Sequence, residues 1–151
     1  MRRSEKEITQ RGEICAVLQR GSICHLGLVD GDEPYVVPVS YGFDGDALYF
    51  HSAGEGRKIE TIREHPRVCF EVTAEWSLQP AETACSWGAS YESVIGWGTA
   101  RLITDPTAKR AALNTIMNQY DDTEAHLFSA SIIDKTTVVR IDIERMTGKR
   151  S

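Results

Sequence analysis

The chain has 151 residues, of which 41% are hydrophobic and 26% charged, and its formal net charge is -5. These values are typical of a globular domain that is long enough to bury a core without disulfides or metals. The negative charge argues against nucleic acid or an anionic membrane as the main partner. The sequence therefore predicts one domain, residues 1–151, in which any basic site is local.

The start of the chain and its cysteines bear on the cellular compartment. The first ten residues, MRRSEKEITQ, are charged and lack the apolar stretch of a secretory signal. No apolar run approaches the ~20 residues that a membrane-spanning helix needs. The four cysteines form no C-x-x-C pair, and no histidine stands at a zinc spacing from them. We expect a cytoplasmic protein with reduced thiols and no metal.

Three helices are expected from the spacing of apolar residues and from their end signals. They cover residues 10–20, 57–65 and 105–120. Gly21 follows the first helix in the position of a C-terminal stop, and Pro66 ends the second. The third is the clearest, because Asp105 is a good N-cap and Pro106 suits the first helical position.

The remaining ordered segments read as strands. Three strands are expected within residues 22–52, joined by turns at DGDEP and DGD, and further strands over 67–72, 90–104 and 136–146. Residues 73–89 show little periodicity and are expected to form a long loop. Strands joined by tight hairpins, with few helices between them, favour a mainly β antiparallel sheet or barrel.

One segment breaks the usual rule for charges in helices. The stretch YFHSAGEGRKIETI, residues 49–62, reads as a strand end, a loop with Gly54 and Gly56, and a helix that begins with Arg57 and Lys58. Cations in a first turn oppose the helix dipole, and each costs roughly 0.3–1 kcal/mol. This placement asks for an explanation.

Two interpretations account for these cations. An anion bound at the helix start would turn the cost into a gain, because the free N–H groups there already attract negative charge. Arg57, Lys58 and the hydroxyl of Ser52 would then suit a terminal phosphate. Alternatively, the turn is a solvated basic surface paired with Glu55 or Glu60.

Five pieces of the chain, taken in their order and spacing, carry a resemblance to a known group. They are CHLGLVDGDEPYVVPVSYGF, LYFHSAGEGRKI, HPRVCFEV, ACSWGASYESVIGWGTA and IDIERMTGKRS. Together they resemble the FMN-binding split β-barrels, which include the pyridoxamine 5′-phosphate oxidases, and within that group the nitroimidazole reductase (nitroimidazole-resistance) family. The resemblance implies an antiparallel split β-barrel that forms a homodimer with FMN at the interface.

The resemblance also implies which residues hold the flavin. Arg57 and Lys58 would clamp its phosphate, a strand backbone would run along its ring, and Ser93 would reach it from the interface. The full implied set is Val37, Pro38, Val39, Ser40, Tyr41, His51, Ser52, Arg57, Lys58 and Ser93. His51 is also a candidate catalytic residue, because it could serve either as a phosphate ligand or as a proton donor to substrate.

Aromatic residues gather in the expected loop and in the strand that follows it. Trp87, Tyr91 and Trp97, with Trp76 nearby, could wall a planar substrate pocket over the flavin. Core or interface packing explains them equally well.

The implied function is reduction of a small planar acceptor, a nitroaromatic or 5-nitroimidazole-like compound, by an FMN-dependent oxidoreductase. The alternative is a flavin- or haem-binding carrier or redox sensor without efficient turnover. Two departures from the oxidases matter: Val36 stands where they often have arginine, and no tryptophan follows Trp97 near the ending MTGKRS. Synthesis of pyridoxal phosphate is therefore not expected.

Overall fold

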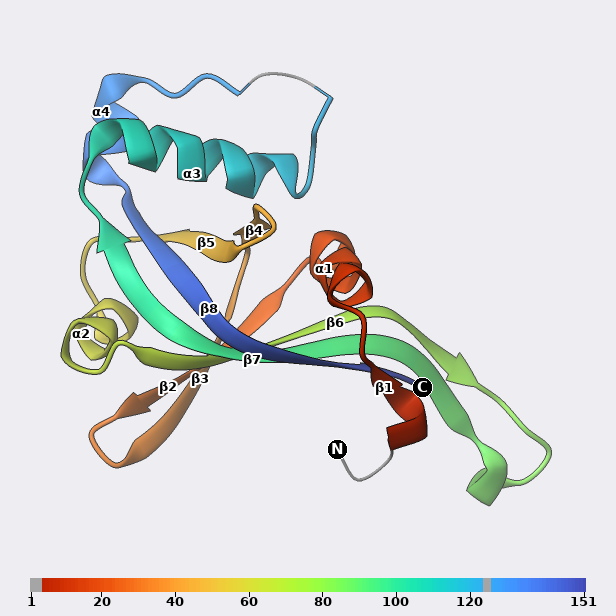
Figure 1. Ribbon diagram of the computed structural model, residues 1–151. Coiled ribbons are helices and arrows are strands. Elements are labelled where there is room, and N and C mark those ends of the chain that lie inside the picture. Colours follow the sequence, from red (N-terminus) through yellow and green to blue (C-terminus); the bar gives the residue numbers. More distant parts are fainter. Residues whose placement is uncertain (1–3, 124–125) are drawn as a thin grey trace.

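Eight strands and four α-helices occur in the part of the chain that the structure, a computed structural model, describes: residues 4–123 and 126–151 (Figure 1). The helices are α1 (Arg11–Arg20), α2 (Arg57–Glu64), α3 (Pro106–Asn118) and α4 (Ala130–Lys135). The strands are β1 (Glu7–Ile8), β2 (Cys24–Asp30), β3 (Glu33–Val39), β4 (Gly42–Phe43), β5 (Ala47–Ser52), β6 (Arg67–Gln79), β7 (Gly88–Ile103) and β8 (Thr137–Arg150). Single 3-10 turns cover Ser4–Lys6 and Ala84–Ser86.

All the strands belong to one antiparallel sheet. Its order is β3-β2-β6-β7-β8-β5-β4, and β1 pairs with β8. The expected mainly β antiparallel architecture is thus confirmed, and its course agrees with a split barrel. The long strands β6, β7 and β8 form the centre, while β3 and β4 are the edges.

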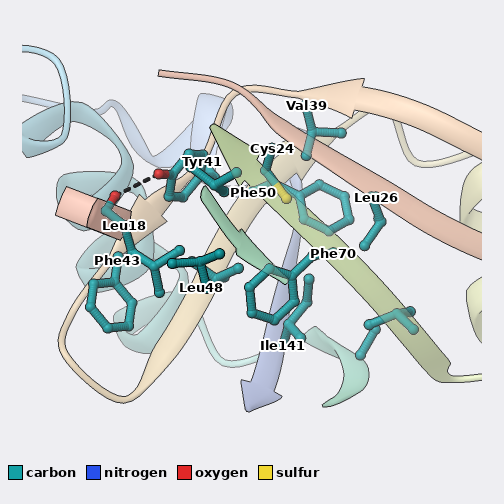
Figure 2. Packing of buried hydrophobic residues seen from close by; sticks show 14 of the residues in the cluster. Leu18, Cys24, Leu26, Val39, Tyr41, Phe43, Leu48, Phe50, Phe70 and Ile141 are labelled. Carbon is teal, nitrogen blue, oxygen red and sulfur yellow. Dashed lines mark hydrogen bonds between the residues drawn. The ribbon is translucent and has the colours of Figure 1, made fainter. Parts of the chain in front are cut away.

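Two hydrophobic clusters lie on opposite faces of this sheet. The larger one joins one face to α1 and α2, and Figure 2 shows how Phe50, Phe70 and Ile141 pack within it. Tyr41 is fully buried there, and its hydroxyl donates to the carbonyl of Leu18 at 2.5 Å (Figure 2). The smaller cluster packs α3 and α4 against the other face of β5 and β8.

The helix-end signals have mixed outcomes. Asp105 caps α3 as predicted, since its carboxylate accepts from the N–H of Ala108 at 2.8 Å, and Pro106 opens the helix. Gly21 does end α1, but with φ -67° rather than the left-handed angle of a glycine stop. Glycine is needed there for space, because a Cβ would lie 2.2 Å from Val72 and 2.7 Å from the Tyr41 hydroxyl.

The prediction of a long loop over residues 73–89 is wrong. β6 continues to Gln79 and β7 already begins at Gly88, so the two strands extend into a paired arm that projects from the barrel (Figure 1). A bulge between Ala74 and Ser77 interrupts the pairing, and Glu75 there has φ +55°. Beyond the bulge both faces of the arm are solvated, so its sequence has no apolar alternation to indicate a strand.

One broad face of the sheet carries exposed apolar side chains. Alternation along the strands and their register place six side chains on the side of the sheet opposite the larger cluster. We call this set the outer face: His25, Val29, Val36, Glu71, Ile95 and Trp97. Val36 is 63% exposed, Val29 52% and Ile95 40%. Such a row of β-branched side chains on a regular sheet is the kind of surface that a second protein covers.

Candidate functional site

The start of α2 has the geometry of an anion site. Gly56 stands at the N-cap with φ +109° and ψ 162°, a conformation that essentially only glycine adopts. Its carbonyl accepts from the N–H groups of Ile59 and Glu60, at 2.9 and 3.1 Å. The N–H groups of Arg57 and Lys58, the first two helical residues, have no partner within the helix. The helix start thus offers two donors beside two cationic side chains.

The side chain of Arg57 is held by the β2–β3 hairpin. Its Nε donates to Asp30 and its Nη2 to Glu33, both at 2.5 Å. Its Cζ lies 4.4 Å from the centroid of the Tyr35 ring. The hydrogen bonds that Arg57 donates to the two carboxylates raise its pKa above its ordinary range. The predicted alternative partners, Glu55 and Glu60, make no ion pair with it.

Sequence reasoning missed these partners. Asp30, Glu33 and Tyr35 belong to a stretch that signals only a hairpin turn. Nothing in the residue pattern says that α2 will lie beside that turn. A search for acidic residues within one turn of the two cations could not have found them, because they precede Arg57 by 27 and 24 residues.

Lys58 differs from its neighbour, because it makes no ion pair with the described residues. Its Nζ lies 5.4 Å from the centroid of the Phe50 ring. Partial burial lowers the pKa of Lys58, since desolvation disfavours the charged form and no carboxylate offsets it. An anion close to this amine would supply the missing partner.

His51 and Ser52 point to opposite faces of β5. Ser52 shares the face of Phe50, on which Lys58 also lies, whereas His51 shares the face of Tyr49, toward α3. His51 therefore does not join Ser52 and Lys58 in one ligand set. It lines a cavity of about 190 Å³ whose other walls are Leu113, Ile116, Met117, Phe128, Ile132 and Thr136.

The strand expected to follow the flavin ring divides into exposed and buried residues. β3 is an edge strand, and Pro38 and Ser40 are exposed, while Val37 is half-buried against the core and Val39 is buried. Tyr41 departs from the expectation. Its side chain is buried and its backbone N–H donates to the Tyr120 hydroxyl at 2.9 Å, so neither group is available to a ligand.

Ser93 lies at the far end of β7 from the helix start. It pairs with Thr73 on β6 and with Lys149 on β8, close to the end of the chain. The other end of β7 lies close to Ser52. Ile103 pairs with Val138 of β8, and the preceding residue of β8, Thr137, pairs with Ser52. Ten residues of extended strand separate Ile103 from Ser93, about 33 Å. Within one chain, the structure does not bring Ser93 to the phosphate clamp.

The three aromatic residues expected to wall a pocket do not meet in the chain. Trp97 lies under the guanidinium of Arg145, 3.5 Å from ring centroid to Cζ. Tyr91 lies six residues before Trp97 on β7, and its hydroxyl accepts from Lys149 at 2.6 Å. Trp87 is 51% exposed at the end of the arm and donates to the Ala81 carbonyl at 2.8 Å. A shared pocket would need groups from a second chain.

Residues 4–123 and 126–151 contain neither a candidate metal cluster nor a helix that could span a membrane. Within these ranges, His, Cys, Asp and Glu side chains form no cluster of three that could hold a metal ion. Across the same ranges, the helices are too short or too polar to cross a bilayer.

Comparison with known proteins agrees with this architecture. Residues 10–150 match the family model described as pyridoxamine 5′-phosphate oxidase. The structure of a candidate 5-nitroimidazole antibiotic resistance protein from Bacteroides thetaiotaomicron is similar with a TM-score of 0.85 and 30% identity, over 95% of this chain and 86% of that one. An FAD-binding protein from Mesorhizobium loti matches with a TM-score of 0.70 and 25% identity, over 97% of each chain.

A flavocytochrome from Azotobacter vinelandii has the same fold, with a TM-score of 0.85 and 24% identity over 100% of this chain and 72% of that one. The antiparallel architecture and these matches therefore place the protein among the split β-barrels of this type. The chain belongs to the pyridoxamine 5′-phosphate oxidase family. The resemblance found in the sequence is confirmed at this level, including its likeness to a nitroimidazole resistance protein.

Proposed function

We propose that the protein is an FMN-dependent oxidoreductase that acts as a homodimer and reduces a small planar acceptor, such as a nitroaromatic compound. The observation that carries the proposal is the start of α2. There a glycine cap, two free N–H groups and an amine without an ion pair within the described chain form a donor set for a terminal phosphate. The likeness to a nitroimidazole resistance protein supports the acceptor class.

The residues present fit a flavin mononucleotide. Lys58, Arg57 and Ser52 would hold its phosphate, and the exposed edge of β3 at Pro38 and Ser40 would lie along its ring. The bound flavin would supply the transfer of electrons or hydride to the acceptor. The phosphate would stabilise the charged form of Lys58 most, because the anion would compensate for the desolvation of this amine.

A homodimer is proposed because the site is incomplete in one chain. Ser93 and Trp97 lie far along β7 from the clamp, so they would join the site of the partner rather than their own. The outer face, with Val36 and Ile95 exposed, would provide the contact surface. An isologous two-fold arrangement would build two equal sites in this way.

His51 is proposed to serve the substrate rather than the phosphate. It is the titratable side chain among the residues that line the 190 Å³ cavity, whose walls are otherwise mostly apolar. This pocket is open to solvent, since its lining residues His51 and Ile132 are exposed, and its volume leaves room for a single-ring compound. If the ring of the bound flavin reaches this side of β5, the imidazole would donate a proton to the substrate as negative charge develops on it.

The test is a spectrum followed by a turnover experiment. Purified protein is mixed with FMN, separated from unbound flavin, reduced without oxygen, and exposed to a 5-nitroimidazole. The proposal expects a bound flavin spectrum and rapid return of the oxidised spectrum with loss of the nitro compound. A bound flavin that no nitro compound reoxidises would favour the carrier alternative. Absence of flavin uptake, or a Soret band instead, would contradict the proposed cofactor.

A further inference from the structure

The contacts of Arg57 are unusual for a residue that is to bind phosphate. Asp30 and Glu33 occupy its Nε and Nη2 groups at 2.5 Å, and the Tyr35 ring covers one face of the guanidinium. All three partners come from the β2–β3 hairpin. Two of the donors that a phosphate would use are therefore already paired with oxygen anions of the chain itself.

The charges around the helix start also oppose a phosphate. The two carboxylates neutralise Arg57 and leave one negative charge in excess, so that Lys58 alone faces an incoming anion as an unpaired cation of the described chain. A phosphomonoester carries about -1.5 to -2 charges at neutral pH. Its approach would bring it near Asp30 and Glu33, where like charges repel. A phosphate would bind more favourably if the guanidinium left the hairpin and turned toward it.

We propose that Asp30 and Glu33 compete with the phosphate of the flavin for Arg57, and so set the affinity of the site. This inference rests on the FMN site proposed above. When the binding-competent state is only partly populated, the apparent Kd rises by the inverse of its fraction. Two exposed ion pairs are weak enough to be exchanged. The hairpin thus acts as a reversible internal competitor that a ligand without phosphate does not have to displace.

The experiment compares isosteric variants by titration with FMN and with riboflavin, which lacks the phosphate. Asp30→Asn combined with Glu33→Gln removes both competing charges. Asp32→Asn is the matched control, because Asp32 is an exposed carboxylate of the same turn with no ion pair to Arg57. We expect the double variant to bind FMN about two- to thirtyfold more tightly than the wild type, the range of two exposed pairs. Riboflavin affinity should stay unchanged, and the control should resemble the wild type.

Three results would overturn the competition. Weaker FMN binding by the double variant would mean that the carboxylates position Arg57 for the phosphate. Unchanged FMN binding would mean that the pairing of Arg57 with the two carboxylates does not limit the affinity for FMN. An equal gain in the Asp32→Asn control would assign the effect to the general charge of the turn.

A second readout separates this inference from the cofactor assignment. Inorganic phosphate is titrated into wild type and double variant while the NMR signal of the Arg57 Nε–H is followed. If neither protein takes up flavin but phosphate binds the double variant more tightly, the competition stands and the FMN proposal fails. If phosphate binds both proteins alike, the competition is excluded.

Discussion

Gln119 and Leu18 are 101 residues apart in the chain, yet the side-chain amide of Gln119 donates to the Leu18 carbonyl at 2.9 Å. The same nitrogen also lies 3.0 Å from the carbonyl of Gln19 and 2.9 Å from that of Gly21. The two N–H groups of this side chain are thus shared among three carbonyls at the end of α1, where a helix leaves carbonyls without partners within itself. This contact ties the helix of the smaller cluster to the helix of the larger one.

Replacing Gln119 should therefore destabilise the fold. We expect Gln119→Ala to lower the free energy of unfolding by about 1–3 kcal/mol, because the carbonyls of Gln19 and Gly21 lose their donor, whereas the Leu18 carbonyl keeps the Tyr41 hydroxyl. Urea denaturation measures the change. Gln79→Ala is the matched control, since Gln79 donates only to Ser77 on the exposed arm. Equal stability of the two variants would show that the link between the helices contributes nothing.

Gly96 is required by the ring of Phe70. A Cβ at residue 96 would lie 2.1 Å from the ring atom Cζ, and Phe70 is fully buried. We expect Gly96→Ala to destabilise the protein by about 1–3 kcal/mol through overpacking. Gly12→Ala in α1, where a Cβ meets nothing within 4 Å, should instead be neutral or stabilising by up to about 1 kcal/mol. Thermal unfolding of both variants tests the contrast.

The carboxylate of Asp44 should make stability depend on acid pH. Burial works to raise the pKa of Asp44, but the N–H groups of Asp46 and Ala47, the Tyr49 hydroxyl and the charge of Arg140 lower it on balance. The folded state therefore favours the charged carboxylate, and this stability is present above its ordinary pKa of 3.8 and is lost as the pH falls through the lower folded value.

Asp44→Asn, which keeps an acceptor but removes the charge, should lower the Tm at neutral pH by about 2–4 °C, the shift that about 1 kcal/mol produces in a domain of this size. The difference from wild type should shrink in acid. A Tm gap that stays constant down to pH 2 would exclude a charge effect. Asp46→Asn, the exposed neighbour paired with Arg11, is the control.

The ends of elements and the sheet class could be predicted from local chemistry. Asp105 and Pro106 start α3 as expected, because a cap depends on neighbours in sequence. The arm beyond Ala74 was missed, since side chains that are solvated on both faces leave no alternation. The six-residue α4 was also missed, because so short a helix shows little periodicity.

The candidate site was only partly accessible to sequence reasoning. Arg57 and Lys58 stand out because their charges conflict with a rule of helix ends. Their different states depend on tertiary packing: the β2–β3 hairpin neutralises Arg57, whereas Lys58 lies over Phe50. The burial of Tyr41 likewise follows from its contacts with Leu18 and Tyr120, far away in sequence.

The exposed apolar side chains of the outer face lead us to expect a dimer. We expect the wild type to have twice the mass of the 16.8 kDa chain in light scattering. Val36→Glu or Ile95→Glu should shift it to the monomer and weaken flavin binding, because a charge on the contact surface is costly to bury. Leu127→Glu, at a leucine that is 94% exposed elsewhere, should leave the mass unchanged. A wild type that is monomeric at all concentrations would contradict the shared site.

The most direct test of the account is the affinity for FMN of three proteins: the wild type, the double variant Arg57→Ala with Lys58→Ala, and Arg11→Ala. Arg11 is also an exposed, ion-paired cation in a first helical turn, but it lies in α1. We predict that the double variant loses FMN affinity by more than about tenfold, as expected for lost charge-assisted hydrogen bonds. Riboflavin affinity and the Arg11→Ala protein should be unaffected. Equal FMN affinity of all three proteins would show that the start of α2 does not bind the phosphate.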